Sequence, residues 1–363
     1  MLNSPPLPAQ IVVDTVVIGA GQAGMAAAYY LQQHGVAFRL LEAAPAAGAA
    51  WDSRYDSLRL FSPAWASGLP GLPWPGRRLR YPTRAETPDY LRHYAAHFGF
   101  PLDAGQRVSR LSTAPAGQPG YAVQTTAGRT YLARRVIIAT GPYTAPHIPA
   151  WAGQLPDTVQ QLHSRDYRRP AQLFGSDEAV AVVGSGNSAL QIAADIAATG
   201  RPIFVGFDEK TPAVPNNHFT WALLVTLGLM RISRTTALGR WMHQRPEPVV
   251  RGDLVRLRSF ANATFIGRAT GARPDGGLIG QRTASPPLAA VVWATGYRPD
   301  FAWIDLPIID AEGRPRHRRG LTEAPGVAFL GLNWLDSRRS ALLNGAGADA
   351  RRVVSELLRQ PLA

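Results

Sequence analysis

The stretch TVVIGAGQAGMAAAYYLQQHG, residues 15 to 35, decides the fold class. Its apolar start predicts a buried β-strand, and the alanine-rich run predicts a helix that reaches about Gln33. The pattern Gly-Ala-Gly-Gln-Ala-Gly lies between them, which makes it far more specific than the same glycines alone. Gly19 permits a tight turn, Gly21 lets a pyrophosphate approach the backbone, and Gly24 lets helix and strand pack closely. The sequence therefore predicts a dinucleotide-binding unit.

An acidic residue indicates which dinucleotide this unit binds. The next strand is AFRLLE, and its terminal Glu42 lies 18 residues past Gly24. A carboxylate there accepts both ribose hydroxyls of an unphosphorylated adenosine and repels a 2′-phosphate. The alternative is a solvated carboxylate at a strand end. We expect this unit to hold FAD or NAD rather than NADP.

A second glycine turn occurs in AVAVVGSGNSALQIAADIA, residues 179 to 197. Ala189 replaces the third glycine, which is tolerated where a methyl group fits between helix and strand. Asn187 and Ser188 either add donors near a phosphate or cap the helix. This turn predicts a second nucleotide site.

The strand after this second helix bears on the choice of coenzyme. An NADPH site usually places an arginine at such a strand end, whereas RPIFVGFDEK ends in Asp208 and Glu209, with Lys210 behind. This pattern favours NADH, although Arg201 or an arginine from another loop could cover the adenosine. The coenzyme is therefore NADPH or NADH.

Two strands with the same ending flank the second turn. YLARRVIIATG ends at residue 141, and VVWATGYRPDF repeats Ala-Thr-Gly at residues 294 to 296. In proteins with two dinucleotide-binding domains, such strands lie where the chain leaves the first domain and re-enters it. We expect the second domain to be inserted between them.

The ordered set of motifs resembles the flavin-dependent (class B) monooxygenases, especially their small bacterial members, over nearly the whole chain. The resemblance rests on both glycine turns, on GAAWDSRYDSLRLFSPAWASGLPGLPWPG at 48 to 76, on HSRDY at 163 to 167 and on ATGYRP at 294 to 299. It implies an α/β fold with two Rossmann-like domains of the three-layer ββα type. The FAD domain would be discontinuous, at 1–145 and 286–363, with an NAD(P)H domain at 146–285.

The resemblance also implies a reaction. NAD(P)H reduces FAD, oxygen forms a C4a-(hydro)peroxyflavin, and one oxygen atom passes to a small organic or metalloid substrate. Because the flavin carries the chemistry, no catalytic side chain is assigned with certainty, and the candidates are His163 and Phe61. The resemblance and the motifs together predict contacts to FAD from Gly19, Gly21, Gln22, Ala23, Gly24, Glu42, Trp51, Val108, Ala139, Thr140, Gly141, Asp336 and Gly345. Contacts to NAD(P) are predicted from Gly184, Ser185, Gly186, Asn187, Ser188, Ala189, Lys210, Thr295 and Gly296.

Three departures from the family pattern keep alternatives open. The fingerprint FxGxxxHxxx(F/W/Y) stands here at 157–167 without its phenylalanine and glycine, and Phe61 aligns with an asparagine of the eukaryotic members. The arginine expected for NADPH is also absent. One alternative is a reductase or oxidase that passes electrons to a quinone or to oxygen. The other is a non-enzymatic, flavin-based redox sensor, for example of ion transport.

The composition limits the class of protein. At 363 residues, 46% hydrophobic and 17% charged, the chain has the composition of a soluble globular protein of about two domains. It has no cysteine, which excludes disulfides, thiolate metal sites and dithiol relays. His93 and His97 lack a third ligand, so we expect no metal site. With neither a signal peptide nor a spanning segment, the cytoplasm is the expected location.

The net charge of +13 raises the question of an anionic partner. The arginines are scattered and no nucleic-acid-binding motif accompanies them, so we expect no nucleic-acid partner. Residues 218 to 245 are apolar in their first half and basic in their second. They could dock on anionic lipid or cover an apolar substrate channel, but a helical insertion packed on the nicotinamide domain is favoured. No motif specifies an oligomeric state.

Overall fold

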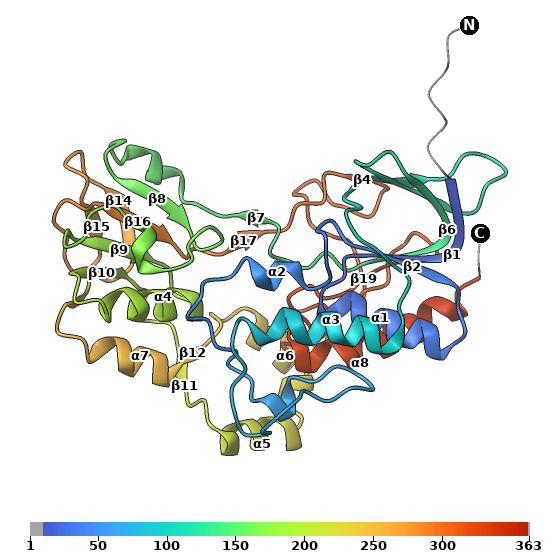
Figure 1. Ribbon diagram of the computed structural model, residues 1–363, viewed down its shortest axis with the longest axis horizontal. Coiled ribbons are helices and arrows are strands. Elements are labelled where there is room, and N and C mark those ends of the chain that lie inside the picture. The colour runs from blue at the N-terminus through green and yellow to red at the C-terminus, as the bar shows by residue number, and fades with distance from the viewer. Residues whose placement is uncertain (1–9, 362–363) are drawn as a thin grey trace, which may run out of the picture.

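The computed structural model describes residues 10–361 and contains two separate large β-sheets. Figure 1 shows them side by side, each with its own helices. We call the eight-stranded sheet with its helices the first unit, and the five-stranded sheet with its helices the second unit. Two short antiparallel strands, β7 (Ala145–Pro146) and β17 (Tyr297–Arg298), connect them.

The first unit is built around the predicted strand–turn–helix. Strand β1 pairs in parallel with β2 and β6, and β4, β5 and β6 form an antiparallel meander. Helices α1, α3 and α8 lie on one side of the sheet (Figure 1). The elements are β1 (Gln10–Ile18), α1 (Gln22–Gln33), β2 (Phe38–Leu41), α2 (Ala49–Asp52), α3 (Glu86–Phe98), β3 (Leu102–Asp103), β4 (Val108–Thr113), β5 (Tyr121–Thr125), β6 (Thr130–Ile138), β18 (Ile304–Asp305), β19 (Val327–Phe329) and α8 (Leu343–Arg359).

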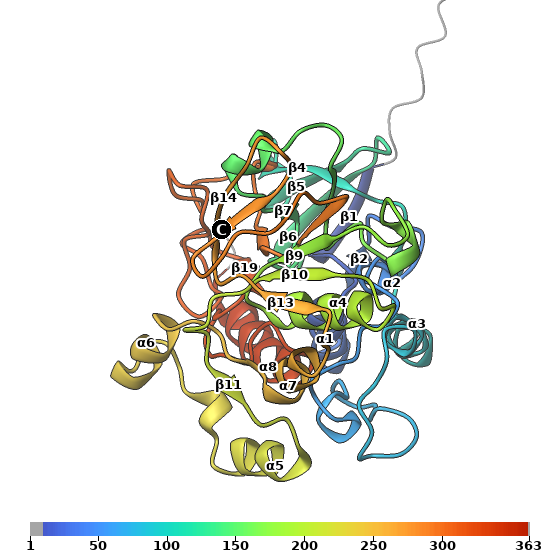
Figure 2. The same cartoon turned by 90° about the vertical axis from the view of Figure 1, so that its left-hand side faces the viewer.

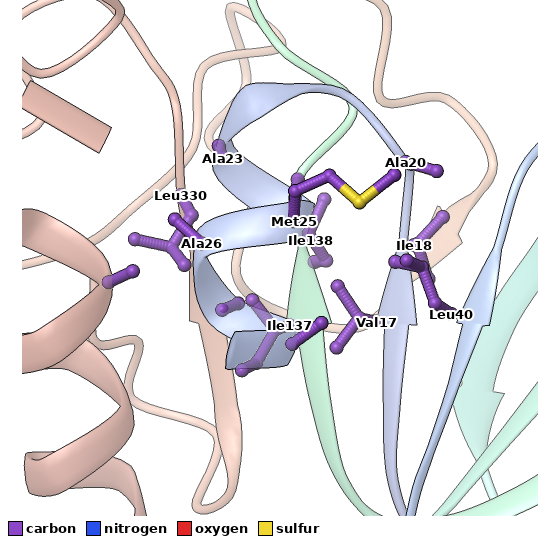
Figure 3. Packing of buried hydrophobic residues seen from close by; sticks show 14 of the residues in the cluster. Val17, Ile18, Ala20, Ala23, Met25, Ala26, Leu40, Ile137, Ile138 and Leu330 are labelled. Carbon is purple, nitrogen blue, oxygen red and sulfur yellow. The ribbon is translucent and has the colours of Figure 1, made fainter. Parts of the chain in front are cut away.

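The core of the first unit explains why α1 is rich in alanine. Small buried residues such as Ala26 and Ala27 let the helix lie close to the sheet and to α8. Figure 3 shows Met25 of this helix in one cluster with Val17 of β1 and Ile137 of β6. Met25 is fully buried, and burying a side chain of this size stabilises the fold by roughly 2 kcal/mol. The glycine turn is thereby held against the strand ends.

The second unit has three layers. Alternate residues of β9 point to opposite faces, with Val180 and Val182 in the cluster under α4 and α7, and Ala181 and Val183 in the cluster under the β14–β15 hairpin. Its strands lie in the order β13-β10-β9-β16-β8, all parallel. The elements are β8 (Gln160–His163), β9 (Val180–Val183), α4 (Asn187–Ala197), β10 (Ile203–Gly206), α7 (Arg251–Arg258), β13 (Ala263–Phe265), β14 (Ala269–Ala272), β15 (Leu278–Gly280) and β16 (Ala290–Trp293).

We propose that the chain returns to the first unit later than residue 286. Strand β16, at 290–293, is fully buried and pairs with β8 and β9, so the second sheet extends past the expected boundary. Each Ala-Thr-Gly is followed within a few residues by one of the paired strands β7 and β17, which connect the units. We propose that the two units divide near Gly141 and Gly296. The α/β fold with two Rossmann-like units, the second inserted into the first, is confirmed.

A segment of the second unit reaches across to the first. We call residues 215–248 the α5–α6 segment, which contains α5 (His218–Thr226) and α6 (Ala237–His243). It leaves the second unit at β11 (Ala213–Val214) and returns at β12 (Val249–Val250). In Figures 1 and 2 both helices lie at the same lower end of the molecule. The prediction that this segment packs on the nicotinamide domain is incomplete, because its side chains also form hydrogen bonds with the first unit.

Candidate functional site

The first glycine turn requires glycine at two places for different reasons. Gly19 has φ +104°, and a Cβ there would lie 2.7 Å from the carbonyl oxygen of Ala139. A Cβ on Gly24 would lie 1.8 Å from the carbonyl oxygen of Gly19. A Cβ on Gly21 meets nothing within 4 Å, so open space lies before this residue. The turn is closed on its strand side and open on the side where a pyrophosphate would approach.

The second glycine turn repeats this geometry. A Cβ on Gly184 would lie 2.2 Å from the carbonyl oxygen of Ala294, and one on Gly186 meets nothing within 4 Å. Ala189 takes the third position and is fully buried at the start of α4. The Ala294 carbonyl thus lies against Gly184 as the Ala139 carbonyl lies against Gly19. Each Ala-Thr-Gly strand therefore contacts one glycine turn.

The starts of α1 and α4 are available to phosphates. The residues just before them, Gly21 and Gly186, have no side chain that could cap the helix. The first N–H groups of a helix lack partners within it and carry partial positive charge, which favours an anion. Asn187 and Ser188 do not cap α4, and the Oδ1 atom of Asn187 instead accepts the Val250 N–H at 2.8 Å.

Glu42 is fixed at the ends of β1 and β2. Its Oε2 accepts the Ala20 N–H at 2.9 Å and its Oε1 accepts the Ala44 N–H at 3.0 Å. The backbone N–H of Gln106 donates to the Glu42 carbonyl at 2.8 Å, which brings the start of β4 at Val108 to the same edge. Glu42 and Val108, both predicted to contact FAD, therefore lie at the same edge.

Other predicted flavin residues meet at the start of α1. The Trp51 indole N–H donates to Gln22 Oε1 at 3.3 Å, and Gln22 Nε2 donates to the Ala341 carbonyl at 3.2 Å. The hydroxyl oxygen of Thr140 is buried and has no hydrogen-bond partner. A buried polar atom of this kind is normally satisfied, so Thr140 is suited to contact a bound group. Ala23 is buried beside Gly331, and a Cβ added to Gly331 would lie 2.7 Å from the Cβ of Ala23.

Two predicted flavin residues have internal roles. The carboxylate of Asp336 accepts two hydrogen bonds from Arg319, each 2.9 Å long, and one from the Ser233 hydroxyl at 2.6 Å. These partners outweigh burial and lower its pKa. Gly345 is required by close packing, since a Cβ there would lie 1.9 Å from the Arg339 carbonyl oxygen. Such contacts are typical of an ordinary loop carboxylate, and the flavin contact of Asp336 stays a prediction.

Charged side chains surround the end of β10. The Asp208 N–H donates to Ser185 Oγ at 2.8 Å, and the Lys210 N–H donates to Asp208 Oδ1 at 3.0 Å. Arg282 comes from the loop after β15 and forms an ion pair with Glu209 at 2.6 Å. Arg282 therefore brings an arginine from another loop to the end of β10, where the sequence of the strand itself has none. Arg201 does not, because it is buried and donates to backbone carbonyls of Phe174 and Glu178.

His163 is buried and links the two units. Its Nε2 lies 2.9 Å from the Gly296 carbonyl oxygen, and its Nδ1 accepts the Arg165 N–H at 3.1 Å. The first contact requires a proton on Nε2 and the second requires a lone pair on Nδ1. Burial lowers the pKa of the ring, which favours this neutral form. Both nitrogens are thus occupied, and Thr295 is held nearby through its hydroxyl, which donates to the His147 carbonyl.

A cation between two tyrosines was not predicted from the sequence. The Arg54 guanidinium donates to the Tyr297 hydroxyl at 2.7 Å and lies 5.3 Å and 5.5 Å from the ring centres of Tyr297 and Tyr143. The Tyr297 ring packs edge-on against His163, with 4.8 Å between ring centres. A tyrosine shortly after each Ala-Thr-Gly was a visible clue. The sequence around Arg54 gave no such clue, because this residue lies in a loop of the first unit, 243 positions before Tyr297.

Phe61 lies under the α5–α6 segment. Its carbonyl accepts the Trp221 indole N–H at 3.0 Å, and the two rings stack with 6.4 Å between centres.

Within residues 10–361 no three histidine or acidic side chains lie together as a metal would require. No helix of that range is both long and apolar enough to cross a membrane.

Comparison with known proteins shows the family to which the chain belongs. The family model of the pyridine nucleotide-disulphide oxidoreductases matches residues 16–220, which contain both glycine turns. The chain belongs to this family. Because it has no cysteine, it cannot itself carry a redox-active disulphide.

Curated relatives and solved structures extend the match to the whole chain. An uncharacterized CzcO-like oxidoreductase from Geobacillus kaustophilus is 35% identical over 355 residues, which cover 96% of this chain and 99% of that protein. The uncharacterized oxidoreductase CzcO from Bacillus subtilis is 32% identical over 95% of this chain and 99% of its own. The structure of a flavin-containing monooxygenase from Stenotrophomonas maltophilia, 29% identical, covers 96% of this chain and 98% of its own with a TM-score of 0.76. The resemblance to flavin monooxygenases is confirmed.

Proposed function

We propose that the chain binds FAD in the first unit and NADPH or NADH in the second, and that it uses molecular oxygen to oxygenate a small organic or metalloid substrate. The observation that carries this proposal is the pair of glycine turns, each closed by an Ala-Thr-Gly strand and open at its second glycine. The similarity to the flavin-containing monooxygenase of Stenotrophomonas maltophilia supports the type of reaction.

The residues of the first unit fit FAD. The open space before Gly21 and the uncapped start of α1 suit a pyrophosphate, and Glu42 suits an adenosine ribose. Thr140 offers a buried hydroxyl without a partner. When bound, FAD supplies a ring that takes up a hydride and passes its electrons to oxygen.

The residues of the second unit fit a nicotinamide coenzyme. Gly186 offers the same open approach, and Lys210 and Arg282 place positive charge near the end of β10, where an adenosine would lie. Because Glu209 pairs with Arg282 and Asp208 lies beside them, the local charge is mixed. We propose that the coenzyme spans the gap between the units with its nicotinamide near His163 and Gly296.

His163 acts by position rather than by proton transfer. Both of its nitrogens are used in hydrogen bonds inside the protein, and its lowered pKa keeps the ring neutral at pH 7. We infer that it fixes the Gly296 carbonyl, and with it the second Ala-Thr-Gly strand, where the units meet. The site thus needs no acid–base pair, in agreement with chemistry carried by a cofactor.

Phe61 favours a second candidate function, that of an NAD(P)H oxidase or reductase. Its ring stacks on Trp221 and its carbonyl is bonded, so it offers no polar side chain to oxygen. In that case electrons pass to a quinone or to oxygen, and no oxygen atom is transferred. A redox sensor would share the fold but show little turnover.

The test is the stoichiometry of turnover. The purified protein is supplied with NADPH or NADH, oxygen and a panel of thioethers, amines, ketones and organometalloids. A monooxygenase forms one oxygenated product per coenzyme consumed. Peroxide formed in step with coenzyme across the whole panel would instead support the oxidase, and negligible coenzyme consumption would support the sensor.

A further inference from the structure

The α5–α6 segment exposes an unusual number of large apolar side chains. Residues 10–361 expose fourteen large hydrophobic side chains, and six of them lie in this segment. The six are Phe219, Leu223, Leu227, Leu229, Leu238 and Trp241. Scattered single apolar residues are normal on a surface, whereas a gathered set marks a contact site.

The exposed residues share helix sides. Phe219, Leu223 and Leu227 are spaced four apart, so they lie on one side of α5 and just past its end. Phe219 is 77% exposed. The opposite side is anchored, since Trp221 is buried and its indole N–H bonds to Phe61 and Asn216. The apolar side of α5 is therefore available although the helix is fixed.

All charged side chains of this segment except Glu247, near its end, are positive. Between Lys210 and Glu247 the sequence has no aspartate or glutamate and four arginines, namely Arg231, Arg234, Arg240 and Arg245. None of these four forms an ion pair with another residue of the range 10–361. The Arg245 guanidinium lies over the exposed Trp241 ring, 4.0 Å from its centre. Apolar groups and unpaired cations are thus intermixed.

The segment is held firmly at its far end. The Ser233 hydroxyl and the Arg234 N–H donate to Asp336 at 2.6 Å and 2.7 Å. The Trp334 indole N–H donates to Glu247 at 2.8 Å. In Figure 2 α5 lies at the bottom of the molecule and α6 at its lower left, both away from the two sheets.

We propose that the α5–α6 segment docks the protein on the surface of an anionic lipid bilayer. Leucine, phenylalanine and tryptophan side chains would enter the boundary between headgroups and acyl chains, and the arginines would meet lipid phosphates. A second copy of this chain fits the surface less well. Two such segments face to face would bring arginines together with no carboxylate between Lys210 and Glu247 to pair with them.

The test measures binding of the whole protein to vesicles and needs no turnover, so its outcome is independent of the proposed function. Protein is centrifuged with vesicles of phosphatidylcholine alone or of phosphatidylcholine mixed with phosphatidylglycerol, at low and high salt. We expect binding to the anionic vesicles that weakens at high salt. Absent binding, or equal binding to both vesicle types, would overturn the proposal.

Matched variants locate the surface. The double variant Phe219→Ser with Leu223→Ser, and separately Arg240→Gln with Arg245→Gln, should each weaken binding about tenfold. Phe174→Ser is the control, because Phe174 is also exposed, at 60%, but lies outside the segment. Equal losses in the control, or none in the double variants, would contradict the assignment. Light scattering that shows a dimer which Phe219→Ser disrupts would assign the surface to self-association instead.

Discussion

The two glycine turns share one backbone design. In the first unit the Gly19 N–H donates to the Leu41 carbonyl and the Ala139 N–H to the Ile18 carbonyl, at 2.7 Å and 2.8 Å. In the second unit the Gly184 N–H donates to Gly206 and the Ala294 N–H to Val183, at 3.0 Å and 2.8 Å. The turn and the Ala-Thr-Gly strand are thus placed in the same way twice.

The units differ in the side chains around that design. The first has Gly24 in contact with the turn, whereas the second accommodates the methyl group of Ala189. The residue directly after the second strand is Glu42 in the first unit and the buried Phe207 in the second. A shared backbone can therefore seat a pyrophosphate in both units, while these side chains make the two nucleotide sites unequal.

Gly24→Ala should break the comparison most strongly. The added Cβ would lie 1.8 Å from the Gly19 carbonyl oxygen, a backbone atom that cannot move alone. Overpacking of this kind costs about 1–3 kcal/mol or more of folding free energy, and we expect the purified variant to lack FAD. The reverse change, Ala189→Gly, should cost only about 0.5–1 kcal/mol and leave FAD bound. Denaturant unfolding and flavin absorbance measure both. Equal effects in the two units would show that the turns pack alike.

Glu42→Gln should weaken FAD binding next. Both carboxylate oxygens accept backbone N–H groups, so the amide would direct its own N–H₂ at one of them. Leaving such a group unpaired costs about 1–3 kcal/mol. The matched change in the second unit, Asp208→Asn, should leave FAD content unchanged. Fluorescence titration of the stripped protein with FAD measures the loss. Unaltered affinity in Glu42→Gln would remove this residue from the site.

Arg54→Lys tests how the units are coupled. A lysine cannot bond Tyr297 and cover both tyrosine rings as the guanidinium does. We expect flavin reduction by NADPH or NADH to slow about tenfold, which corresponds to about 1.4 kcal/mol. Tyr297→Phe keeps the ring and should slow it less. Reduction by dithionite and FAD content should not change. Equal slowing with dithionite would indicate a general structural defect rather than a role in positioning the units.

Arg282→Ala should have the smallest effect, on coenzyme choice alone. Arg282 is exposed and paired with Glu209, so its interaction with a 2′-phosphate would contribute about 1 kcal/mol or less. The KM for NADPH should rise a few-fold with the KM for NADH unchanged. Initial rates with each coenzyme measure this, and a parallel rise for both would place Arg282 outside the adenosine site.

Local sequence predicted the parts of this molecule that local physics determines. The strand–turn–helix units at Gly19 and Gly184 were found because apolar strands, small helix residues and glycines follow one another at fixed spacing. The point where the chain returns to the first unit is hard to locate from the sequence because Ala-Thr-Gly occurs in both units, and only strand pairing shows to which sheet 290–293 belongs.

The rest depends on contacts between distant loops. Arg282 meets Glu209 across 73 positions and Arg54 meets Tyr297 across 243, and no spacing rule connects such pairs. Asp336 shows the converse. Its position near the chain end predicts a flavin contact, and nothing in the sequence indicates the hydrogen bonds that Arg319 and Ser233 donate to its carboxylate.

The most direct test of the account is anaerobic mixing of the purified protein with NADPH, and separately with NADH, in a stopped-flow spectrometer. In the proposed function the first unit carries FAD and the second delivers the coenzyme that reduces it. We expect a yellow protein whose flavin absorbance is bleached by at least one coenzyme. Gly184→Ala, which crowds the Ala294 carbonyl, should abolish the bleaching while FAD stays bound. A protein purified without flavin, or a bound flavin that neither coenzyme reduces, would contradict the proposed function.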